Sequence, residues 1–291
     1  QGILSYAGRF NYNYAGKYFL QASIRRDGLS SLPMNNKWGN FPGVSVGWTI
    51  SKENFMEKIS KVVSDFKVRA SYAKVGNTDI GNYPYLGLFS NYKYADYTGV
   101  AYSQIYNPDL KWETSNKYDL GVDLALFSNR LKFTFDYFEN KVTDMIIEAP
   151  LAPSLGVPNN SIFKNIGDMK NKGFEFSVDY NVLNTERFGL DVNANLTLMS
   201  NKVLALANNN ADIFSSANNI IRVGESLRSI YGFDYWGVNA ANGNPVYYKA
   251  DGSLVQGLVG QGSYAVFDPS NPNDVSKSST LGLSDKKVLG N

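Results

Sequence analysis

Residues 130–144 read RLKFTFDYFENKVTD, and their apolar and polar side chains alternate with a period of two. One parity holds Leu131, Phe133, Phe135 and Tyr137, and the other holds Lys132, Thr134, Asp136 and Phe138. Successive side chains of a β-strand point to opposite faces of the sheet. The stretch therefore predicts a strand with an aromatic face and a largely polar face.

The same alternation recurs along most of the first 200 residues. It is found in residues 3–14, 17–28, 43–50, 66–74, 117–127, 172–182 and 188–198. With the opening stretch this predicts about eight strands, each of about 8 to 12 residues, where a globular strand has about 5 or 6. The fold class predicted is all-β and antiparallel.

The predicted connections alternate in length. Short turns join residues 14–18, 127–131 and 182–188. Long connections cover residues 27–40, 76–111 and 142–170, and everything after 201. A longer segment on the short-turn side, residues 51–66, is predicted to form a small amphipathic helix, because Phe55, Ile59, Val62 and Val63 recur at near-helical spacing. Short turns at one end and long loops at the other are typical of outer-membrane barrels.

Two environments can receive the aromatic faces: the core of a soluble sandwich or the lipid of a membrane. Strand length, Tyr and Phe near strand ends and one-sided loops favour a membrane barrel. In that case Trp48, Phe133, Phe135, Phe174 and Phe176 face lipid, and Arg69, Asp123, Asp136, Glu175 and Asp179 face the lumen. An unpaired sheet edge is costly in lipid, and the chain starts in a strand and ends without one. We therefore expect an internal piece of a larger barrel.

Composition narrows the function. The 291 residues contain no Cys and no His, which removes disulfides, thiolate or imidazole metal sites and His-dependent catalysis. The net charge of +2 gives no reason to expect nucleic acid. No apolar run reaches the roughly 18 residues of a membrane helix. Asp119, Asp123 and Asp136 could be read as acid–base carboxylates, but polarity of a lumen wall or contact with a plug explains them better. No enzyme activity, cofactor or metal is expected.

Five stretches, in order, resemble one known family. They are GKYFLQASIRRDGLSSL, NNKWGNFPGVSVGWTISKENFM, VRASYAKVGN followed by IGNYPYL, NPDLKWETSNKYDLGVDLALFSNRLKFTFDYFENKVTDMI, and NIGDMKNKGFEFSVDYNV. Together they resemble the SusC/RagA family of TonB-dependent outer-membrane transporters from Bacteroidetes-type Gram-negative bacteria. The resemblance runs from about residue 5 to residue 203. Leu29 and Leu32 depart from it, because smaller or basic residues are expected there.

The resemblance implies a 22-stranded barrel filled by a plug. It implies a SusD-like surface lipoprotein as lid, energy from the TonB–ExbB–ExbD complex, and import of a glycan or an oligopeptide. Residues 1–203 would be part of the barrel wall, and residues 204–291 a large extracellular loop region. The plug, the TonB-contacting segment and the final strands would lie outside these residues. The alternatives are a passive porin or structural surface barrel, and a soluble β-sandwich that binds carbohydrate.

The long connection at residues 76–112 is rich in aromatic residues, which can stack on sugars or clamp a peptide. Its candidate substrate-binding residues are Tyr92, Tyr94, Tyr97, Tyr102, Tyr106 and Trp112. The competing interpretation is that the rings pack the loop on itself. Further on, Asp268, Asn271, Asn273 and Asp274 could bind Ca²⁺, although turn chemistry explains the same residues and is preferred. Gly257, Gly260 and Gly262 lack the strand–turn–helix context of a phosphate loop.

Overall fold

The computed structural model describes residues 2–79, 81–157 and 160–290, with the side chains of Tyr94 and Asn208 left aside. The chain forms two compact units, Gln1–Asn209 and Asn210–Asn291. Strands dominate both, and every strand pair in the described residues is antiparallel. The predicted all-β, antiparallel fold class is confirmed.

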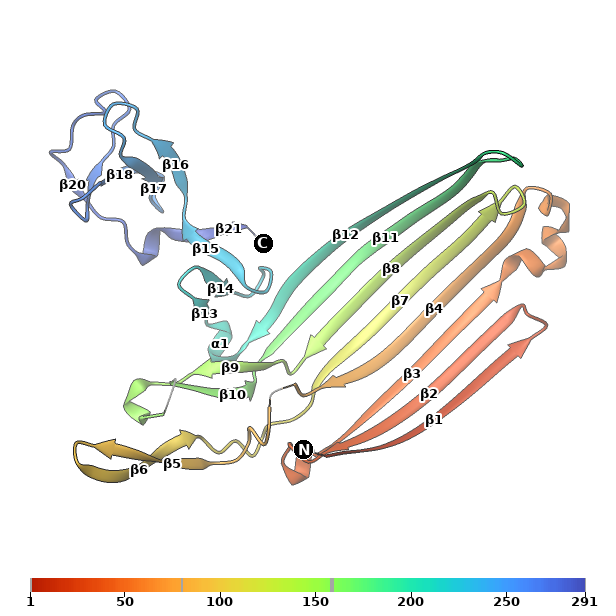
Figure 1. The fold of residues 1–291 in the computed structure, drawn as a ribbon, viewed down its shortest axis with the longest axis horizontal. Coiled ribbons are helices and arrows are strands. Elements are labelled where there is room, and N and C mark those ends of the chain that lie inside the picture. The colour runs from red at the N-terminus through yellow and green to blue at the C-terminus, as the bar shows by residue number, and fades with distance from the viewer. Residues whose placement is uncertain (1, 80, 158–159, 291) are drawn as a thin grey trace. The chain divides into compact units, whose positions relative to one another are not determined.

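The first unit is built on one eight-stranded sheet with the order β1-β2-β3-β4-β7-β8-β11-β12. These long strands lie side by side in a single layer (Figure 1). Their bounds are β1 (Ile3–Tyr14), β2 (Tyr18–Leu29), β3 (Trp38–Thr49), β4 (Val63–Asn77), β7 (Glu113–Leu126), β8 (Leu131–Thr143), β11 (Gly167–Asn184) and β12 (Gly189–Leu206). All eight segments with the alternating pattern are strands of this sheet.

Two hairpins extend from one end of this sheet (Figure 1). The first, β5 (Leu88–Tyr94) and β6 (Tyr97–Gln104), lies in the connection between β4 and β7. The second, β9 (Ile146–Pro150) and β10 (Ser161–Asn165), lies between β8 and β11, with the 3-10 helix η4 (Pro153–Leu155) in its loop. The long predicted connections at residues 76–111 and 142–170 therefore carry secondary structure of their own.

The strand register divides the sheet into two chemically different faces. One row of paired residues crosses all eight strands on the apolar face: Tyr14, Tyr18, Trp48, Val68, Val122, Phe135, Phe176 and Leu196. The adjacent row on the polar face is Asn13, Phe19, Gly47, Arg69, Gly121, Asp136, Glu175 and Thr197. The period-two pattern of each strand thus becomes a property of the whole sheet.

The apolar face of the sheet is exposed. Leu196 retains 55% of its surface and Phe135 41%; apolar side chains on seven strands of the face are exposed in this way, and those of β4 are half-buried. In a sandwich this face would pack on a second sheet and be buried. A single layer with an exposed apolar face is inconsistent with the soluble-sandwich alternative.

The short turns use left-handed backbone. Ala15 and Gly16 have φ of 53° and 62°, and Phe127, Ser128 and Asn129 also have positive φ. The helix predicted at residues 51–66 is shorter and of another type: the segment forms two 3-10 helices, η2 (Ile50–Lys52) and η3 (Asn54–Ile59), and no α-helix. Val62 O accepts the backbone N–H of Phe127, so the segment's last residues continue into β4 instead of a helix. Among its apolar residues only Met56 is buried.

The predicted loop at residues 27–40 is shorter in the structure. Asp27 and Gly28 pair with Gly39 and Trp38, so β2 and β3 extend farther than the alternation indicated. Only residues 30–37 connect the two strands, and they contain the 3-10 helix η1 (Met34–Asn36). Leu29, an exception to the family pattern, ends β2.

The second unit contains two small sheets. One has the order β13-β14-β15-β21 and the other β16-β17-β18-β19-β20. Their bounds are β13 (Ile213–Ser216), β14 (Asn219–Ile221), β15 (Ser229–Phe233), β16 (Tyr235–Val238), β17 (Pro245–Tyr248), β18 (Leu254–Leu258), β19 (Ser263–Val266), β20 (Ser278–Ser279) and β21 (Lys286–Gly290). The 3-10 helix η6 (Leu283–Asp285) precedes β21, and the single-turn helix α1 (Ala207–Asn210) follows β12.

A buried amide holds the five-stranded sheet to its loops. Gln256 is fully buried, and its Oε1 accepts from Nδ2 of Asn239 at 3.0 Å, Asn242 at 3.1 Å and Asn244 at 3.3 Å. Its Nε2 donates to Asp274 O at 3.3 Å. A satisfied buried amide fixes a single loop arrangement, because leaving it unpaired would be costly. This accounts for the Asn-rich sequence NAANGN.

No helix in the described ranges is long and apolar enough to cross a membrane.

Candidate functional site

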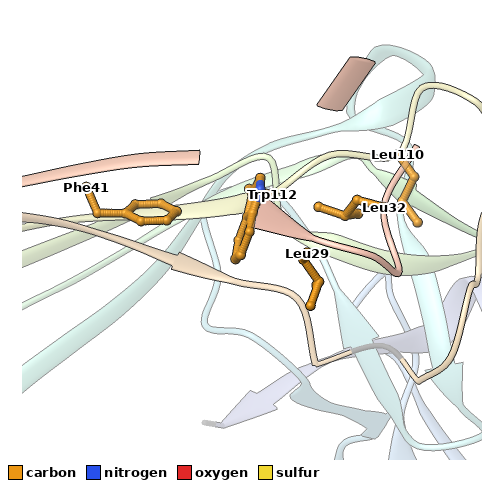
Figure 2. Close-up of a cluster of buried hydrophobic side chains, with 5 residues drawn as sticks. All are labelled: Leu29, Leu32, Phe41, Leu110 and Trp112. Carbon is orange, nitrogen blue, oxygen red and sulfur yellow. The ribbon is translucent and has the colours of Figure 1, made fainter. Parts of the chain in front are cut away.

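A buried cluster sits where the long connections leave the sheet. It consists of Leu29, Leu32, Phe41, Leu110 and Trp112, and we call it the loop-end cluster (Figure 2). Phe41 and Trp112 meet edge to face with ring centroids 5.2 Å apart. Tyr85, Ile146 and Phe163 pack against the cluster from both hairpin-bearing connections. The two leucines that depart from the family pattern are therefore core residues here.

Hydrogen bonds tie the β2–β3 loop to the segment before β7. Asn36 Nδ2 donates to Leu110 O and Trp112 Nε1 donates to Lys37 O, each at 3.2 Å. Because Trp112 is 8% exposed and its one polar atom is used here, it supports the loop base. The structure thus places this candidate substrate-binding residue in the core and not on the loop surface.

A second group of bonds ties the β4–β7 connection to the β8–β11 connection. Asn165 Nδ2 donates to Lys111 O at 2.9 Å and to Asp144 O at 2.8 Å, and its Oδ1 accepts from Lys111 N at 2.9 Å. Lys111 Nζ pairs with Asp144 Oδ1 at 2.9 Å. Asn107 Nδ2 donates to Phe163 O at 2.7 Å. Three long connections therefore share one fixed base.

The β5–β6 hairpin carries exposed rings on both of its faces. Register pairs Tyr92 with Gly99 and brings Tyr92 and Tyr97 to one face. On the other face Phe89 and Tyr102 are paired and stack with centroids 4.3 Å apart. Tyr97 is 79% exposed at the hairpin tip, and the other three rings are exposed as well.

The remaining predicted aromatic positions fall elsewhere. Tyr106 is exposed and lies beside the hairpin base, where its Cβ is 3.3 Å from the position that a Cβ on Gly87 would occupy. Gln104 Nε2 fastens this base by donating to Tyr83 O at 3.0 Å and Leu86 O at 2.8 Å. Tyr94 is also a predicted substrate-binding residue, and its side chain lies outside the described part of the structure. A hollow of about 480 Å³ is lined by hairpin residues, among them Tyr92 and Tyr102, and by residues 156–157.

The polar face of the sheet carries a charge cluster made of Arg69, Asp119, Asp123 and Asp136. The Arg69 guanidinium lies 3.4 Å from Asp119 Oδ1, 3.2 Å from Asp123 Oδ2 and 2.6 Å from Asp136 Oδ1. One cation among three carboxylates leaves the cluster negatively charged. Gly121 makes room for it, because a Cβ there would lie 2.4 Å from Asp136 Oδ1 and 2.5 Å from Arg69 Cζ.

Other predicted lumen residues lie on the same face as this cluster. Glu175 is directly opposite Asp136, and Asp179 is opposite Lys132. Trp48, Phe133, Phe135, Phe174 and Phe176 all lie on the apolar face; Phe135 stacks on Phe174 with ring centroids 5.8 Å apart. The structure groups these residues as the alternation pattern did, with the aromatic rings on one face and the carboxylates on the other.

These features resemble those of one protein family. A family model described as "TonB dependent receptor-like, beta-barrel" matches residues 4–272. The chain belongs to the TonB-dependent receptor β-barrel family. Two relatives are TonB-dependent receptor P3 of Formosa agariphila, 35% identical over 97% of the chain, and TonB-dependent receptor SusC of Bacteroides thetaiotaomicron, 28% identical over 91%. The chain spans 30% of the length of each.

Solved structures agree with this assignment. The RagAB peptide importer matches with a TM-score of 0.80 in its closed-closed state and 0.79 in its open-open state. The match covers 99% of this chain in both states, and 30% and 29% of the importer chain, at 26% and 25% identity. The predicted SusC/RagA-type identity and outer-membrane location are confirmed: this TonB-dependent receptor is an outer-membrane protein.

Sequence reasoning missed several residues that shape this receptor's loop end and its charge cluster. Phe89 is not among the predicted binding residues, although the two-residue turn Ala95-Asp96 fixes the register that pairs it with Tyr102. The role of Gly121 could not be recognised from the sequence, because a glycine in a strand does not indicate which side chains lie over it. Asn165 ends β10, and the residues that it bonds, Lys111 and Asp144, are distant in sequence.

The calcium and glycine motifs of the second unit serve turns. Asp268 Oδ1 accepts from Ser270 N at 2.8 Å and Asp274 Oδ1 accepts from Ser276 N at 2.9 Å. The pKa of the Asp274 carboxyl is lowered, chiefly by a hydrogen bond from the Ser276 side chain and next by the bond from the Ser276 backbone N–H. Gly260 and Gly262 have positive φ in a turn. Within the described ranges, no group of three or more acidic, His or Cys side chains is arranged to hold a metal.

Proposed function

We propose that this chain forms part of the wall and the outer loops of a TonB-energised importer. Its cargo is a large nutrient, a glycan or an oligopeptide, taken up with a SusD-like lipoprotein. The TonB–ExbB–ExbD complex supplies energy through parts of the protein beyond these residues. Membership of the TonB-dependent receptor family supports the energy coupling, and the RagAB complex, described as a peptide importer, supports the paired arrangement.

The observation that carries the proposal is an exposed aromatic hairpin on a fixed base. Tyr92 and Tyr97 on one face, and the Phe89–Tyr102 stack on the other, offer large rigid contact surfaces with polar ends. The loop-end cluster holds the hairpin's connection to its neighbours. Binding residues are commonly carried by loops that a rigid scaffold positions. Substrate stacking on these rings is the role we assign to them.

The two faces of the sheet fit the same function. The aromatic and aliphatic face is suited to lipid, because outward-facing apolar bands flanked by Tyr and Trp are the rule in outer-membrane barrels. The face with the Arg69 charge cluster is suited to a wet lumen, where partly exposed ion pairs are well solvated. Long loops then lie outside the cell and the short turns in the periplasm.

The experiment replaces the hairpin rings in the full-length protein. Tyr92→Ala with Tyr97→Ala should reduce substrate capture and growth on the cognate glycan or peptide, by about fivefold or more for each ring that contacts substrate. Phe89→Ala with Tyr102→Ala tests the other face. Phe188→Ala is the matched control, because this exposed ring lies at the short-turn end of the sheet.

Two results would oppose the proposal. Normal uptake by both hairpin variants, at normal surface levels, would remove the binding role. Uptake that persists in cells lacking TonB would favour the passive-porin alternative. Surface labelling of a Cys introduced at Asp96 checks the topology independently, since it should react from outside the cell.

A further inference from the structure

The connection between β3 and β4 exposes apolar side chains at the short-turn end of the sheet. Phe55 is 65% exposed, and Ile59 and Val62 are also exposed. Met56 is buried and holds η3 in place. The connection itself leaves nearly half or more of each of these side chains uncovered. A connection of η2 and η3 that only had to link two strands would not need three exposed apolar residues.

This connection is fastened to the aromatic end of the apolar face. Glu53 accepts hydrogen bonds from Tyr18 Oη at 2.6 Å, Trp48 Nε1 at 3.1 Å and Lys17 Nζ at 3.2 Å. The pKa of the Glu53 carboxyl is lowered, chiefly by the bond from Tyr18 and next by that from Trp48. Tyr14, Tyr18 and Trp48 stack in a row, with centroid distances of 6.4 Å at each step. The connection that carries the exposed apolar side chains is thus fixed to the end of the lipid-suited face.

The charge of the segment is positive. The connection carries three lysines, Lys52, Lys58 and Lys61, and two glutamates, Glu53 and Glu57. Lys17 is engaged by Glu53. Lys52, Lys58 and Lys61 are exposed, and among the described residues no carboxylate lies within ion-pair distance of them. Lys52 Nζ lies across the β1–β2 turn, 2.7 Å from the position of a Cβ on Gly16, so this charge is drawn toward the neighbouring hairpin.

We propose that the η2–η3 connection is a phospholipid-binding anchor at the membrane surface. Phe55, Ile59 and Val62 enter the boundary between headgroups and acyl chains, and Lys52, Lys58 and Lys61 bind the phosphates of anionic phospholipids. Apolar side chains with flanking lysines are the composition of interfacial segments. Lysine can also bury its stem in the boundary while its ammonium stays at headgroup level.

Lipid fits this surface better than a protein partner. The protein is an outer-membrane protein, and the surface is joined through Glu53, Tyr18 and Trp48 to the aromatic end of its apolar face. Tyr and Trp at this position mark the membrane–water interface. A lysine near an anionic membrane surface contributes on the order of fivefold in binding. The three free lysines therefore predict a preference for anionic over zwitterionic lipid, which a purely apolar contact would not show.

The test uses the full-length protein in nanodiscs, labelled at single introduced cysteines with an environment-sensitive fluorophore. Phe55→Cys reports the proposed anchor. Val100→Cys is the matched control, because Val100 on the β5–β6 hairpin is 69% exposed and equally apolar. Quenching by headgroup-labelled lipid is compared in discs with and without phosphatidylglycerol. A second protein carries Lys52→Gln, Lys58→Gln and Lys61→Gln in addition to Phe55→Cys.

The expected result is a blue-shifted, lipid-quenched signal at position 55 and a water-exposed signal at position 100. Phosphatidylglycerol should bind near position 55 more strongly than zwitterionic lipid, and the triple glutamine variant should lose that preference. A signal at position 55 as water-exposed as that at position 100 overturns the anchor. Equal quenching with both lipids in the protein with its lysines intact overturns headgroup binding. Native protein assembly in the variants is checked by the heat-modifiable mobility of the folded barrel.

Discussion

A comparison of Phe135→Lys with Thr134→Lys tests which face of the sheet contacts lipid. The two residues are neighbours in β8 and point to opposite faces. Phe135 lies two residues from Tyr137, the middle of the strand, and is paired with Val122 and Phe176 on the apolar face. Thr134 is paired with Asp123 and Ser177 on the polar face. The two variants therefore place a lysine on opposite faces of the sheet at nearly the same position along the strand.

The magnitude follows from what each position loses. A lysine on the lipid side near the midplane costs about 2–4 kcal/mol. Loss of the Phe135–Phe174 ring contact adds about 0.5–1.5 kcal/mol. We therefore expect Phe135→Lys to destabilise the full-length barrel by about 2.5–5.5 kcal/mol. Thr134→Lys places a cation opposite Asp123 in a polar setting, and a change within about 0.5 kcal/mol is expected.

The assay is reversible urea unfolding of the full-length protein in lipid vesicles, with the amount of folded protein in outer membranes as a second measurement. Phe135→Leu is the control for shape, because it removes the ring without adding charge and should cost much less than the lysine. Equal destabilisation by the lysines at 134 and 135 would refute the assignment of faces. A larger effect at 134 would reverse it.

Two further substitutions test the polar face and the loop base. Gly121→Val should destabilise the sheet by about 1–3 kcal/mol in the same unfolding assay, because a Cβ there would lie 2.5 Å from Arg69 Cζ. Gly8→Val should be tolerated, because its Cβ would have its nearest neighbour at 3.9 Å. Equal costs for the two variants would contradict the reasoning. Trp112→Ala should destabilise the loop-end cluster by about 3–5 kcal/mol and speed proteolysis of the β4–β7 connection. Tyr97→Ala, at an exposed tip, should leave the rate of proteolysis unchanged. Unchanged proteolysis in Trp112→Ala would show that the cluster does not hold the loops.

The sheet was predictable from sequence because each strand carries its own pattern. In β8 and β11 the alternation of aromatic and polar residues covers enough positions to fix which residues share a face. Strand ends were less predictable, because pairing such as Asp27 with Gly39 depends on a partner strand and not on local alternation. The helix expected around Phe55 is a short 3-10 helix, and β4 takes the residues from Val63 onward that were expected to extend it.

The loop site was predictable in composition but not in arrangement. The Tyr-rich connection was evident, whereas the burial of Trp112 depends on Leu29, Leu32 and Phe41, which are far away in sequence. The Phe89–Tyr102 stack follows from hairpin register, which the turn at Ala95 and Asp96 sets. Gly121 could not be found at all, because its importance comes from an arginine on the adjacent strand.

The distribution of buried side chains separates the stability of the sheet from that of the loops. Across the described part of the first unit, the eight-stranded sheet has exposed side chains on both faces, while the buried aromatic and aliphatic cluster is at the loop end. In the orientation that we propose, the sheet therefore depends on its backbone hydrogen bonds and on lipid against its apolar face. The loops depend on side-chain packing, as a soluble domain does. Removal of lipid should consequently weaken the sheet before the loop-end cluster, and changes in the cluster should alter recognition while the sheet still assembles.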